Sequence, residues 1–382
     1  MFFNAVLYLA LLLFLVGLIY KISRWFSKYV GTGDRNIAAS QRIASGLKGV
    51  ASVIFSVKVF SLVKVLIVDV LLQLRILRDK KDPLVWVMHI LIFAGFAFLL
   101  LFHALDSHIT VALYPDYQST LNPFIFLRNL GGMFVLTGLV LAIIRRAVVL
   151  KGRIKTSGMD IYAIAILAVV IGSGFLLESL KITSQAEFED MVAEYSDIDE
   201  PVDKLALESY WVENFGLVSP NVDLPVSGQT LAKGLELHET NCWDCHSRPQ
   251  SAFISYPLSR LIKPFALRLD RIEARTVVRY IHFMACFFGL ALLAFSKLFH
   301  MVSTPVSLVI AEVSQQYQDR ATAANRQMIE RDGCSHGGGC HEECPVRKRR
   351  MERIAQSVPY EPMLTYAGER SADKLGSREV SS

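Results

Sequence analysis

The chain has 382 residues, of which 52% are hydrophobic and only 20% charged, against about 25% charged in a soluble domain. Its net charge of +5 lies in local clusters, so it gives no argument for a nucleic-acid-binding protein. Six cysteines in this length do not make a disulfide framework, and their grouping favours cofactor sites instead.

Five apolar segments are long enough to cross a bilayer, which takes about 20 residues of helix. They are Phe2–Tyr20, Leu84–Leu105, Leu130–Ile144, Ile161–Leu180 and Val277–Met301. The third is short and is expected to begin nearer Phe124. The first has no basic start and no small-residue cleavage site, so we interpret it as a retained helix. The sequence therefore predicts an all-α integral membrane protein with five transmembrane helices.

A sixth apolar run, Val50–Leu74, is interrupted by Lys58, Lys64 and Asp69. Basic residues stand on both sides of it, so a crossing would place one basic cluster on the outer side. We expect instead an amphipathic helix over about 50–78 on the cytoplasmic face, with a true span as the alternative.

The basic loops set the orientation, because Lys and Arg accumulate on the cytoplasmic side. They hold Lys21, Arg24, Lys28, Lys80, Lys81, Arg145, Arg146, Lys151, Arg153 and Lys155. The N-terminus is therefore expected outside and the C-terminus inside the cytoplasmic membrane. We expect helices one to four within 1–180, a periplasmic insertion over 181–274, the fifth helix over 275–303 and a cytoplasmic tail over 304–382.

The predicted insertion is acidic at its start and basic at its end. Between Ile182 and Asn241 there are thirteen Asp or Glu against only Lys204 and Lys233, which suits the outer side. The end disagrees with the orientation, since six basic residues crowd the outer entry to the fifth helix: Arg260, Lys263, Arg268, Arg271, Arg275 and Arg279. These side chains either serve haem propionates or anionic headgroups, or form a solvated basic face.

Within the insertion, Cys242-Trp243-Asp244-Cys245-His246 has the form C-x-x-C-H, the attachment sequence of a c-type haem. Cys242 and Cys245 would bind one covalent haem c, and His246 would be its axial ligand. The predicted topology places the motif outside, where such haems are attached. A chance thiol pair or part of a zinc site are the alternatives, although no second C-x-x-C lies nearby to complete one.

The sequence leaves several candidates for the second axial ligand of this haem. His108 of the neighbouring outer loop is slightly favoured over Met191, and a five-coordinate or partner-completed iron is a further alternative. His238 lies four residues before Cys242, so we do not expect it to reach across the macrocycle.

Four of the nine histidines lie in predicted spans, where ionisable residues are costly and mark functional sites. At about 100° per residue, the step from His89 to His103 leaves them roughly 40° apart, and the step from His282 to His300 returns to the same face. Because the two helices run in opposite directions, we expect His103 and His282 to hold an outer haem b. We expect His89 and His300 to hold an inner one.

Gly95 and Gly289 lie between the paired histidines. They would either let a macrocycle approach the backbone or let helices pack closely.

These features resemble the gamma subunit of respiratory nitrate reductase, and more closely the cytochrome b subunits of heterodisulfide-reductase-like and sulfate-reducer membrane redox complexes. The resemblance rests on the histidine pattern, "VDVLLQLRILRDKKDPLVWVMHILIFAGFAFLLLFHALD" and "STLNPFIFLRNLGG", and covers about residues 1–180 and 275–305. It implies two b haems, a site for menaquinone or a related quinone near the outer haem, and a cytoplasmic iron–sulfur partner. The C-x-x-C-H insertion departs from this pattern.

The quinone site is expected beside the loop Asp106–Asn122. Three polar residues there, His108, Tyr114 and Tyr117, could bond quinone oxygens and relay protons.

The tail contains "DGCSHGGGCHEECPVRKRR", in which Cys334, Cys340 and Cys344 echo the end of iron–sulfur motifs. Three thiolates with a further ligand would hold an iron–sulfur cluster or zinc. A reduced, glycine-rich docking segment is the alternative.

The sequence thus predicts a membrane electron conduit between the quinone pool, a cytoplasmic heterodisulfide-reductase-like iron–sulfur subunit and a periplasmic cytochrome c. The alternative is a haem-based redox sensor that signals through its cytoplasmic tail. No nucleophile–base arrangement indicates a hydrolase, and no repeat or pair of broken helices indicates a transporter.

Overall fold

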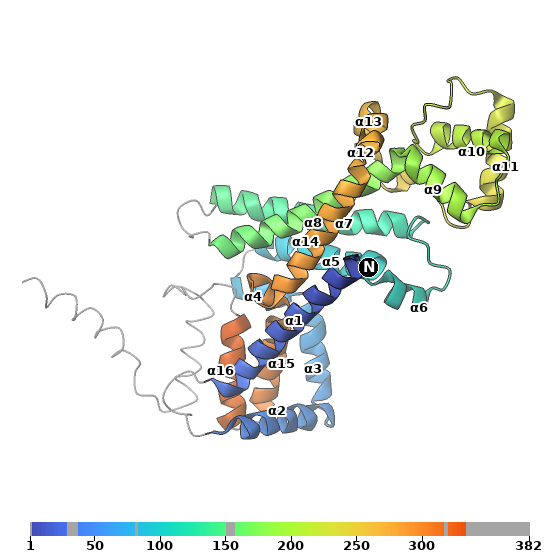
Figure 1. Cartoon of the computed structure of the whole chain (residues 1–382). Helices are drawn as coiled ribbons and strands as arrows, with labels where there is room; N and C mark the ends of the chain where they lie inside the picture. Colours follow the sequence, from blue (N-terminus) through green and yellow to red (C-terminus); the bar gives the residue numbers. More distant parts are fainter. Residues whose placement is uncertain (1, 29–36, 81–82, 150–156, 317–319, 334–382) are drawn as a thin grey trace, which may run out of the picture. The chain divides into compact units, whose positions relative to one another are not determined.

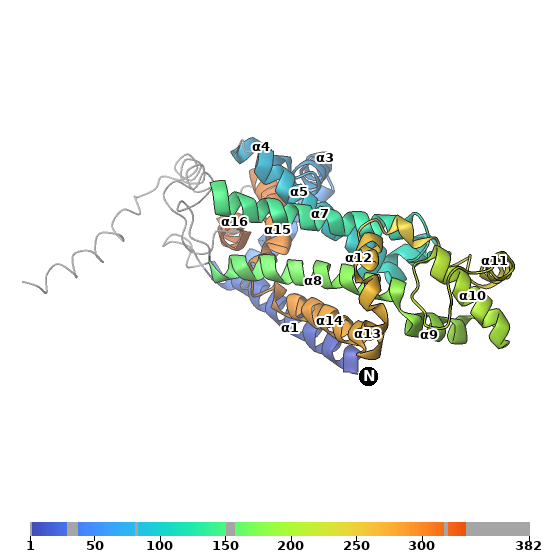
Figure 2. The same ribbon diagram turned by 90° about the horizontal axis from the view of Figure 1, so that it is seen from above.

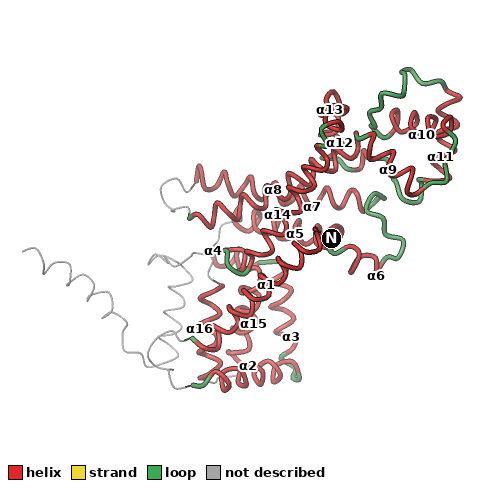
Figure 3. The backbone as a smooth tube through the Cα atoms, viewed as in Figure 1, coloured by secondary structure: helices red, strands yellow, loops and turns green. Residues whose placement is uncertain are grey.

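The computed structural model describes residues 2–28, 37–80, 83–149, 157–316 and 320–333. Every regular element in these ranges is helical, and no strand occurs in them (Figure 3). The chain divides into two compact units, 1–334 and 335–382, of which the second lies outside the described residues.

Five described helices are long and apolar enough to cross a membrane. They are α1 (Phe2–Ser27), α5 (Pro83–Leu99) with its π-helical extension (Leu100–Ala104), α7 (Phe124–Ile144) with the start of its own extension (Arg145–Val149), α8 (Gly158–Thr183) and α14 (Ala274–Leu293). A lipid-exposed backbone must satisfy its polar groups internally, and a continuous helix does so. The first four predicted spans are confirmed, and the third begins at Phe124 as expected.

These helices pack in a defined order within the first unit. α5 packs along α7, α7 along α8, and α8 along α14, which also contacts α1 (Figures 1 and 2). α5 and α14 make no comparably close backbone contact. The two helices that were predicted to share haems are therefore kept apart, each packed on its own neighbour.

The predicted fifth helix is shorter than expected. α14 ends at Leu293, and after a turn and a 3₁₀ turn (Lys297–Phe299) a new helix, α15 (His300–Gln316), begins. The break lies at Ser296, which is extended and accepts a hydrogen bond from the Leu298 amide with its side chain. Serine competes in this way with helical hydrogen bonds. The prediction of one helix through Met301 is wrong, and His300 is the first residue of α15.

The predicted interfacial helix over 50–78 is not one helix. It is divided among α2 (Ala39–Ile54), α3 (Val59–Lys64), a π-helical segment (Val65–Leu71) and α4 (Leu74–Lys80). The part before Ile54 and the part from Val59 are bent by 97° relative to each other. The amide of Lys58 in the break donates to the Ser56 hydroxyl. Taken together, the two parts are long and apolar enough to cross a membrane. The described residues therefore contain five candidate spans, or six if this bent pair forms one span.

The first part of the predicted tail is well organised. α15 packs against α16 (Arg320–Gly333), α2 and α3, and α16 packs against α2. Arg42 of α2 is fully buried there. Its guanidinium donates to the Asn325 side chain at 2.9 Å and to the carbonyls of Trp25 and Lys28 at 2.8 and 2.7 Å. A buried charge requires such a full set of acceptors.

The insertion between α8 and α14 is a small helical module. Its elements are α9 (Gln185–Tyr195), α10 (Pro201–Asn214), α11 (Gly228–Asn241), α12 (Ser255–Ile262) and α13 (Ala266–Arg271). Ser184 and Ser227 cap α9 and α11 by accepting from the amides of Glu187 and Thr230, as serine does at helix starts. The core of the module consists of Phe188, Val192, Leu207, Leu217 and Cys242.

Candidate functional site

The four intramembrane histidines come together in the two predicted pairs. The ring centroids of His103 and His282 are 6.1 Å apart, and those of His89 and His300 are 6.0 Å apart. His103 lies in the π-helical extension of α5 and His89 in α5 itself, whereas the partners lie on α14 and at the start of α15. Both pairs therefore bridge the separation between α5 and the α14–α15 side.

The spacing of both pairs fits one metal ion between two imidazoles. At about 2.0–2.1 Å for each metal–nitrogen bond, two axial imidazoles have ring centroids roughly 6 Å apart. The residues present therefore fit the iron of a bis-histidine haem.

The hydrogen bonds of two of these rings favour the same role. His282 Nδ1 lies 3.1 Å from the Val170 carbonyl and 3.1 Å from the Ser173 hydroxyl. His300 Nδ1 lies 2.6 Å from the Lys297 carbonyl. A backbone carbonyl can only accept, so Nδ1 carries the proton and Nε2 is left to bind a metal. Because the helix is interrupted at Ser296, the Lys297 carbonyl lies beside His300 and can accept a hydrogen bond from its Nδ1.

The glycines between the paired histidines differ from each other. A Cβ atom on Gly95 would overlap the Gly131 carbonyl and meet Phe134 and Val135, so this glycine serves the packing of α5 on α7. A Cβ atom on Gly289 would meet only Ile166, at 3.4 Å. Neither glycine therefore gives specific evidence for a haem cradle.

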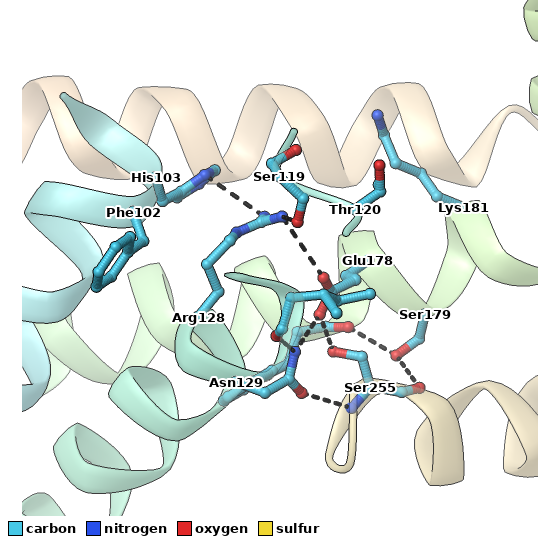
Figure 4. A network of polar contacts seen from close by, with 12 residues as sticks. Phe102, His103, Ser119, Thr120, Arg128, Asn129, Glu178, Ser179, Lys181 and Ser255 are labelled. Atoms are coloured by element: carbon cyan, nitrogen blue, oxygen red, sulfur yellow. Dashed lines mark hydrogen bonds and ion pairs between the residues drawn. The ribbon is translucent and has the colours of Figure 1, made fainter. Parts of the chain in front are cut away.

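Polar residues form a network beside His103, where the start of α7 and the end of α8 meet α12 (Figure 4). Glu178 accepts hydrogen bonds from the Asn129 side chain at 2.9 Å and the Ser255 hydroxyl at 2.5 Å. Asn129 in turn accepts from the amides of Ile254 and Ser255. The network fastens α12 to α7 and α8.

Arg128 is a cation of this network and lies beside His103 (Figure 4). Its Nη1 donates to the Ser119 carbonyl at 3.1 Å, and its Nη2 lies 3.5 Å from His103 Nδ1. Sequence reasoning missed both Arg128 and Glu178. The signal was available, because a charged residue inside a span is expensive and marks a functional region.

The predicted quinone loop holds its three polar residues in different settings. His108 is exposed and its Nδ1 lies 3.0 Å from the Ser107 hydroxyl, and Tyr114 is exposed as well. Tyr117 is buried, and its hydroxyl donates to the Phe102 carbonyl at 2.5 Å. Burial raises the pKa of this tyrosine. Tyr117 therefore holds the backbone beside His103, and only the other two side chains are accessible.

Part of the basic cluster before and at the start of α14 is paired with acidic residues of the insertion. Arg275 forms ion pairs with Glu187 and Asp190 of α9. Glu187 also lies 2.8 Å from Lys181 and 3.9 Å from Arg279. The acidic start of the insertion thus pairs with two of the six basic residues that disagreed with the predicted orientation, Arg275 and Arg279.

The C-x-x-C-H motif forms a turn directly after α11, in which the amides of Cys245 and His246 both donate to the Cys242 carbonyl. Cys242 is buried in the core of the insertion, and Cys245 is exposed. Burial raises the pKa of the Cys242 thiol to about 11. The His246 ring packs edge-on against Trp211, with centroids 5.4 Å apart, and its burial lowers its pKa to about 4.

Two buried polar atoms near this motif have no hydrogen-bond partner among the described residues, namely His238 Nδ1 and Trp211 Nε1. Such orphaned atoms are rare in native proteins and indicate a missing group. Cys242, His246 and this aromatic surrounding thus fit an additional planar group. Met191 packs on the cluster that contains Cys242, whereas within the described ranges the only side-chain hydrogen bond of His108 is to its neighbour Ser107. This favours Met191 over His108 as the second axial ligand.

Cys334, Cys340 and Cys344 lie outside the described residues, so their predicted cluster or zinc site stays a prediction. Within the described ranges, no three His, Cys, Asp or Glu side chains come together as ligands of a metal ion.

Two curated relatives match the chain, and each is the E subunit of a dihydromethanophenazine:CoB–CoM heterodisulfide reductase. The protein of Methanosarcina barkeri is 31% identical over 193 residues, and that of Methanosarcina thermophila is 28% identical over 193 residues. Each alignment covers 45% of this chain and 69% of the relative. No family model and no solved structure matches. The matches support the heterodisulfide reductase part of the resemblance, and the nitrate reductase part stays a prediction.

Proposed function

The chain belongs to the family of these heterodisulfide reductase membrane subunits, and from this premise we propose that it conducts electrons across the cytoplasmic membrane through two b haems. Membership and the apolar helices make it a membrane cytochrome b subunit of a heterodisulfide-reductase-type redox complex. In the proposal, His103 and His282 hold the outer haem b, and His89 and His300 the inner one. The haem supplies the redox chemistry, and the protein supplies ligands, burial and spacing.

The observation that carries this proposal is the pairing of the four histidines. Two pairs with centroids 6.0 and 6.1 Å apart bridge two helices that do not otherwise pack together. His282 and His300 also have Nδ1 beside backbone carbonyls, which leaves Nε2 without the proton and able to bind a metal. Chance intramembrane histidines would not share all of these features.

We propose where the electron path runs, but not in which direction the electrons flow along it. With the N-terminus outside and the C-terminus inside, the outer haem lies near the quinone loop Asp106–Asn122, where menaquinol or a related quinol would react. The relatives' name pairs dihydromethanophenazine with the CoB–CoM heterodisulfide. For this chain we propose a cytoplasmic iron–sulfur subunit related to the catalytic partner of such reductases at the inner end.

The C-x-x-C-H motif adds an outer branch to the path. Cys242 and Cys245 would bind one covalent haem c with His246 as axial ligand, and a periplasmic cytochrome c would exchange electrons with it. The orphaned His238 Nδ1 and Trp211 Nε1 beside the motif support this assignment. Cys334, Cys340 and Cys344 would hold an iron–sulfur cluster or zinc near the soluble partner.

Reduced-minus-oxidised spectra of purified protein test the proposal. We expect two b haems and one haem c, all reduced by a menaquinol analogue. His282→Ala should remove one b haem and leave the other, and His300→Ala should do the converse, whereas His108→Ala should keep both b haems. A His282→Ala protein that retains two b haems would refute the ligand assignment. A wild-type protein that binds no haem would refute the function.

A further inference from the structure

Arg128 is a permanently charged residue with an incomplete set of acceptors. It lies one turn inside α7, and its side chain is only 18% exposed. Its Nε is buried without a hydrogen-bond partner among the described residues, and its Nη1 is bonded only to the Ser119 carbonyl at 3.1 Å within that part of the chain. A guanidinium cannot lose its charge in a protein, so this position calls for an anion.

Glu178 does not fill that need. Arg128 Nη1 lies 3.9 Å from Glu178 Oε1, which is at the limit of an ion pair. The other carboxylate oxygen accepts from Asn129 and Ser255 at 2.9 and 2.5 Å. Neutral donors thus hold the carboxylate in place, and the guanidinium extends past it toward His103 (Figure 4).

His103 cannot be the acceptor once it binds iron. Arg128 Nη2 lies 3.5 Å from His103 Nδ1, and a haem-ligating histidine that binds through Nε2 carries its proton on Nδ1. Two donors would then face each other. The guanidinium must therefore have another acceptor close to His103 when the outer haem is present.

We propose that Arg128 binds a propionate carboxylate of the outer haem b; this inference rests on the proposed function. Arginine pairs with a carboxylate through two parallel hydrogen bonds, and haem would supply two propionate carboxylates. The Ser119 carbonyl positions the guanidinium. Arg128 is thus a positioning and charge-compensating residue, which stabilises the reduced haem because the neighbouring positive charge offsets the propionate.

The test compares Arg128→Gln and Arg128→Lys in detergent-solubilised full-length protein, by optical redox titration of both b haems. Arg128→Gln should lower the midpoint potential of one b haem so that its reduction equilibrium becomes about tenfold less favourable, which is about 59 mV for one electron. The other b haem should keep its potential. Arg128→Lys keeps the positive charge, so the midpoint potential of that b haem should stay close to the wild-type value.

A second variant separates haem binding from packing. Glu178→Gln keeps the shape of the network and leaves Arg128 in place, so both b haem potentials should stay near those of the wild type. If Arg128 only stabilised Glu178, the two variants would behave alike, and the proposal would be wrong. A change in quinol affinity with unchanged potentials in Arg128→Gln would mean that the residue binds quinone instead, which also overturns it.

If the Arg128→Gln protein loses the outer haem, its potential cannot be titrated, and a third measurement is used instead. Haem-depleted wild-type protein should bind haem more tightly than haem dimethyl ester, whose carboxylates are blocked. Arg128→Gln should abolish that difference, and an undiminished preference would contradict the proposal. A wild-type protein without b haems would instead refute the proposed function itself, so the two failures are distinguishable.

Discussion

The hydroxyl of Thr120 donates a hydrogen bond to the backbone carbonyl of Cys245, which is 125 residues later in the chain. Two more bonds extend the contact, from the Ser247 amide to the Thr120 carbonyl at 3.1 Å and from the Asn122 amide to the Ser247 hydroxyl at 2.9 Å. Ser119, the neighbour of Thr120, accepts from Arg128. The C-x-x-C-H turn is thus fastened to the loop that also contacts the outer histidine pair through Arg128.

Thr120→Val should loosen this attachment. The loss of one neutral hydrogen bond costs about 1 kcal/mol, so amide exchange over residues 245–251 should become roughly fivefold faster, as measured by hydrogen–deuterium exchange. Thr240→Val is the matched control, because the Thr240 hydroxyl bonds only to the Glu236 carbonyl of its own helix among the described residues. Equal exchange in both variants would mean that Thr120 does not fasten the turn.

Gly95→Ala should disrupt the membrane domain, whereas Gly289→Ala should be tolerated. The added methyl group at Gly95 overlaps the Gly131 carbonyl on α7, which cannot rotate away, whereas at Gly289 it meets only the Ile166 side chain at 3.4 Å. Overpacking of this kind costs about 1–3 kcal/mol or more. Thermal unfolding in detergent should show a lower midpoint for Gly95→Ala alone. A larger loss for Gly289→Ala would contradict this assignment of roles.

The sequence sufficed for the histidine pairs but not for the path of the backbone between them. Apolar runs and the opposite directions of the spans predicted which imidazoles meet. The face argument holds for His89 and His103, whereas for His282 and His300 it assumed one helix and His300 in fact begins α15. The break at Ser296 was missed because a single serine in an apolar run does not change the hydropathy pattern. The 97° bend after Ile54 was missed for a different reason, because Lys58 in the break was interpreted as part of the polar face of one amphipathic helix.

The partners of Arg128 and the ion pairs of Glu187 could not be predicted from the sequence. Both depend on which segments meet in space. The insertion places α9 beside the start of α14, so Glu187 meets Arg275 and Arg279. Charge counting along the chain could register a disagreement with the positive-inside rule but could not identify the compensating acidic residues.

The two thiols of the C-x-x-C-H motif should differ in reactivity when the chain is produced without haem attachment. Cys245 is exposed, whereas Cys242 is buried with its pKa raised to about 11. At pH 8 roughly a thousandth of the Cys242 thiols are thiolate, and the thiolate is the form that reacts. Peptide mass spectrometry after iodoacetamide treatment should therefore find Cys245 alkylated well before Cys242.

Protein produced with haem attachment should show neither thiol alkylated, since both sulfurs would be bonded to the haem. Haem staining of the denatured chain should then be positive. Equal, rapid labelling of both cysteines in that protein would mean that the motif carries no covalent haem.

His238 should make the stability of the insertion depend on pH. Its ring is 2% exposed and packs against Tyr210 and Phe215 at centroid distances of 5.4 and 4.8 Å. Burial, and then the charge of Arg248, lower its pKa from the ordinary value. Below a pH of about 6.5, His238 therefore binds a proton in the unfolded chain but stays neutral in the folded chain. The contribution of neutral His238 is complete above that pH and is lost as the pH falls toward the lowered pKa.

Urea unfolding of the haem-loaded protein in detergent, followed by tryptophan fluorescence in a background with Trp25→Phe and Trp86→Phe, measures this effect through Trp211 and Trp243. Between pH 7.5 and 5.0 the wild type should lose more stability than His238→Leu, by up to about 1.4 kcal/mol for each pH unit below the unfolded pKa. Leucine keeps an apolar side chain in the core and cannot take up a proton. His108→Ala, at an exposed position, should keep the wild-type pH dependence. If His238→Leu loses as much stability on acidification as the wild type, the acid sensitivity comes from the carboxylates of the insertion and not from this buried imidazole.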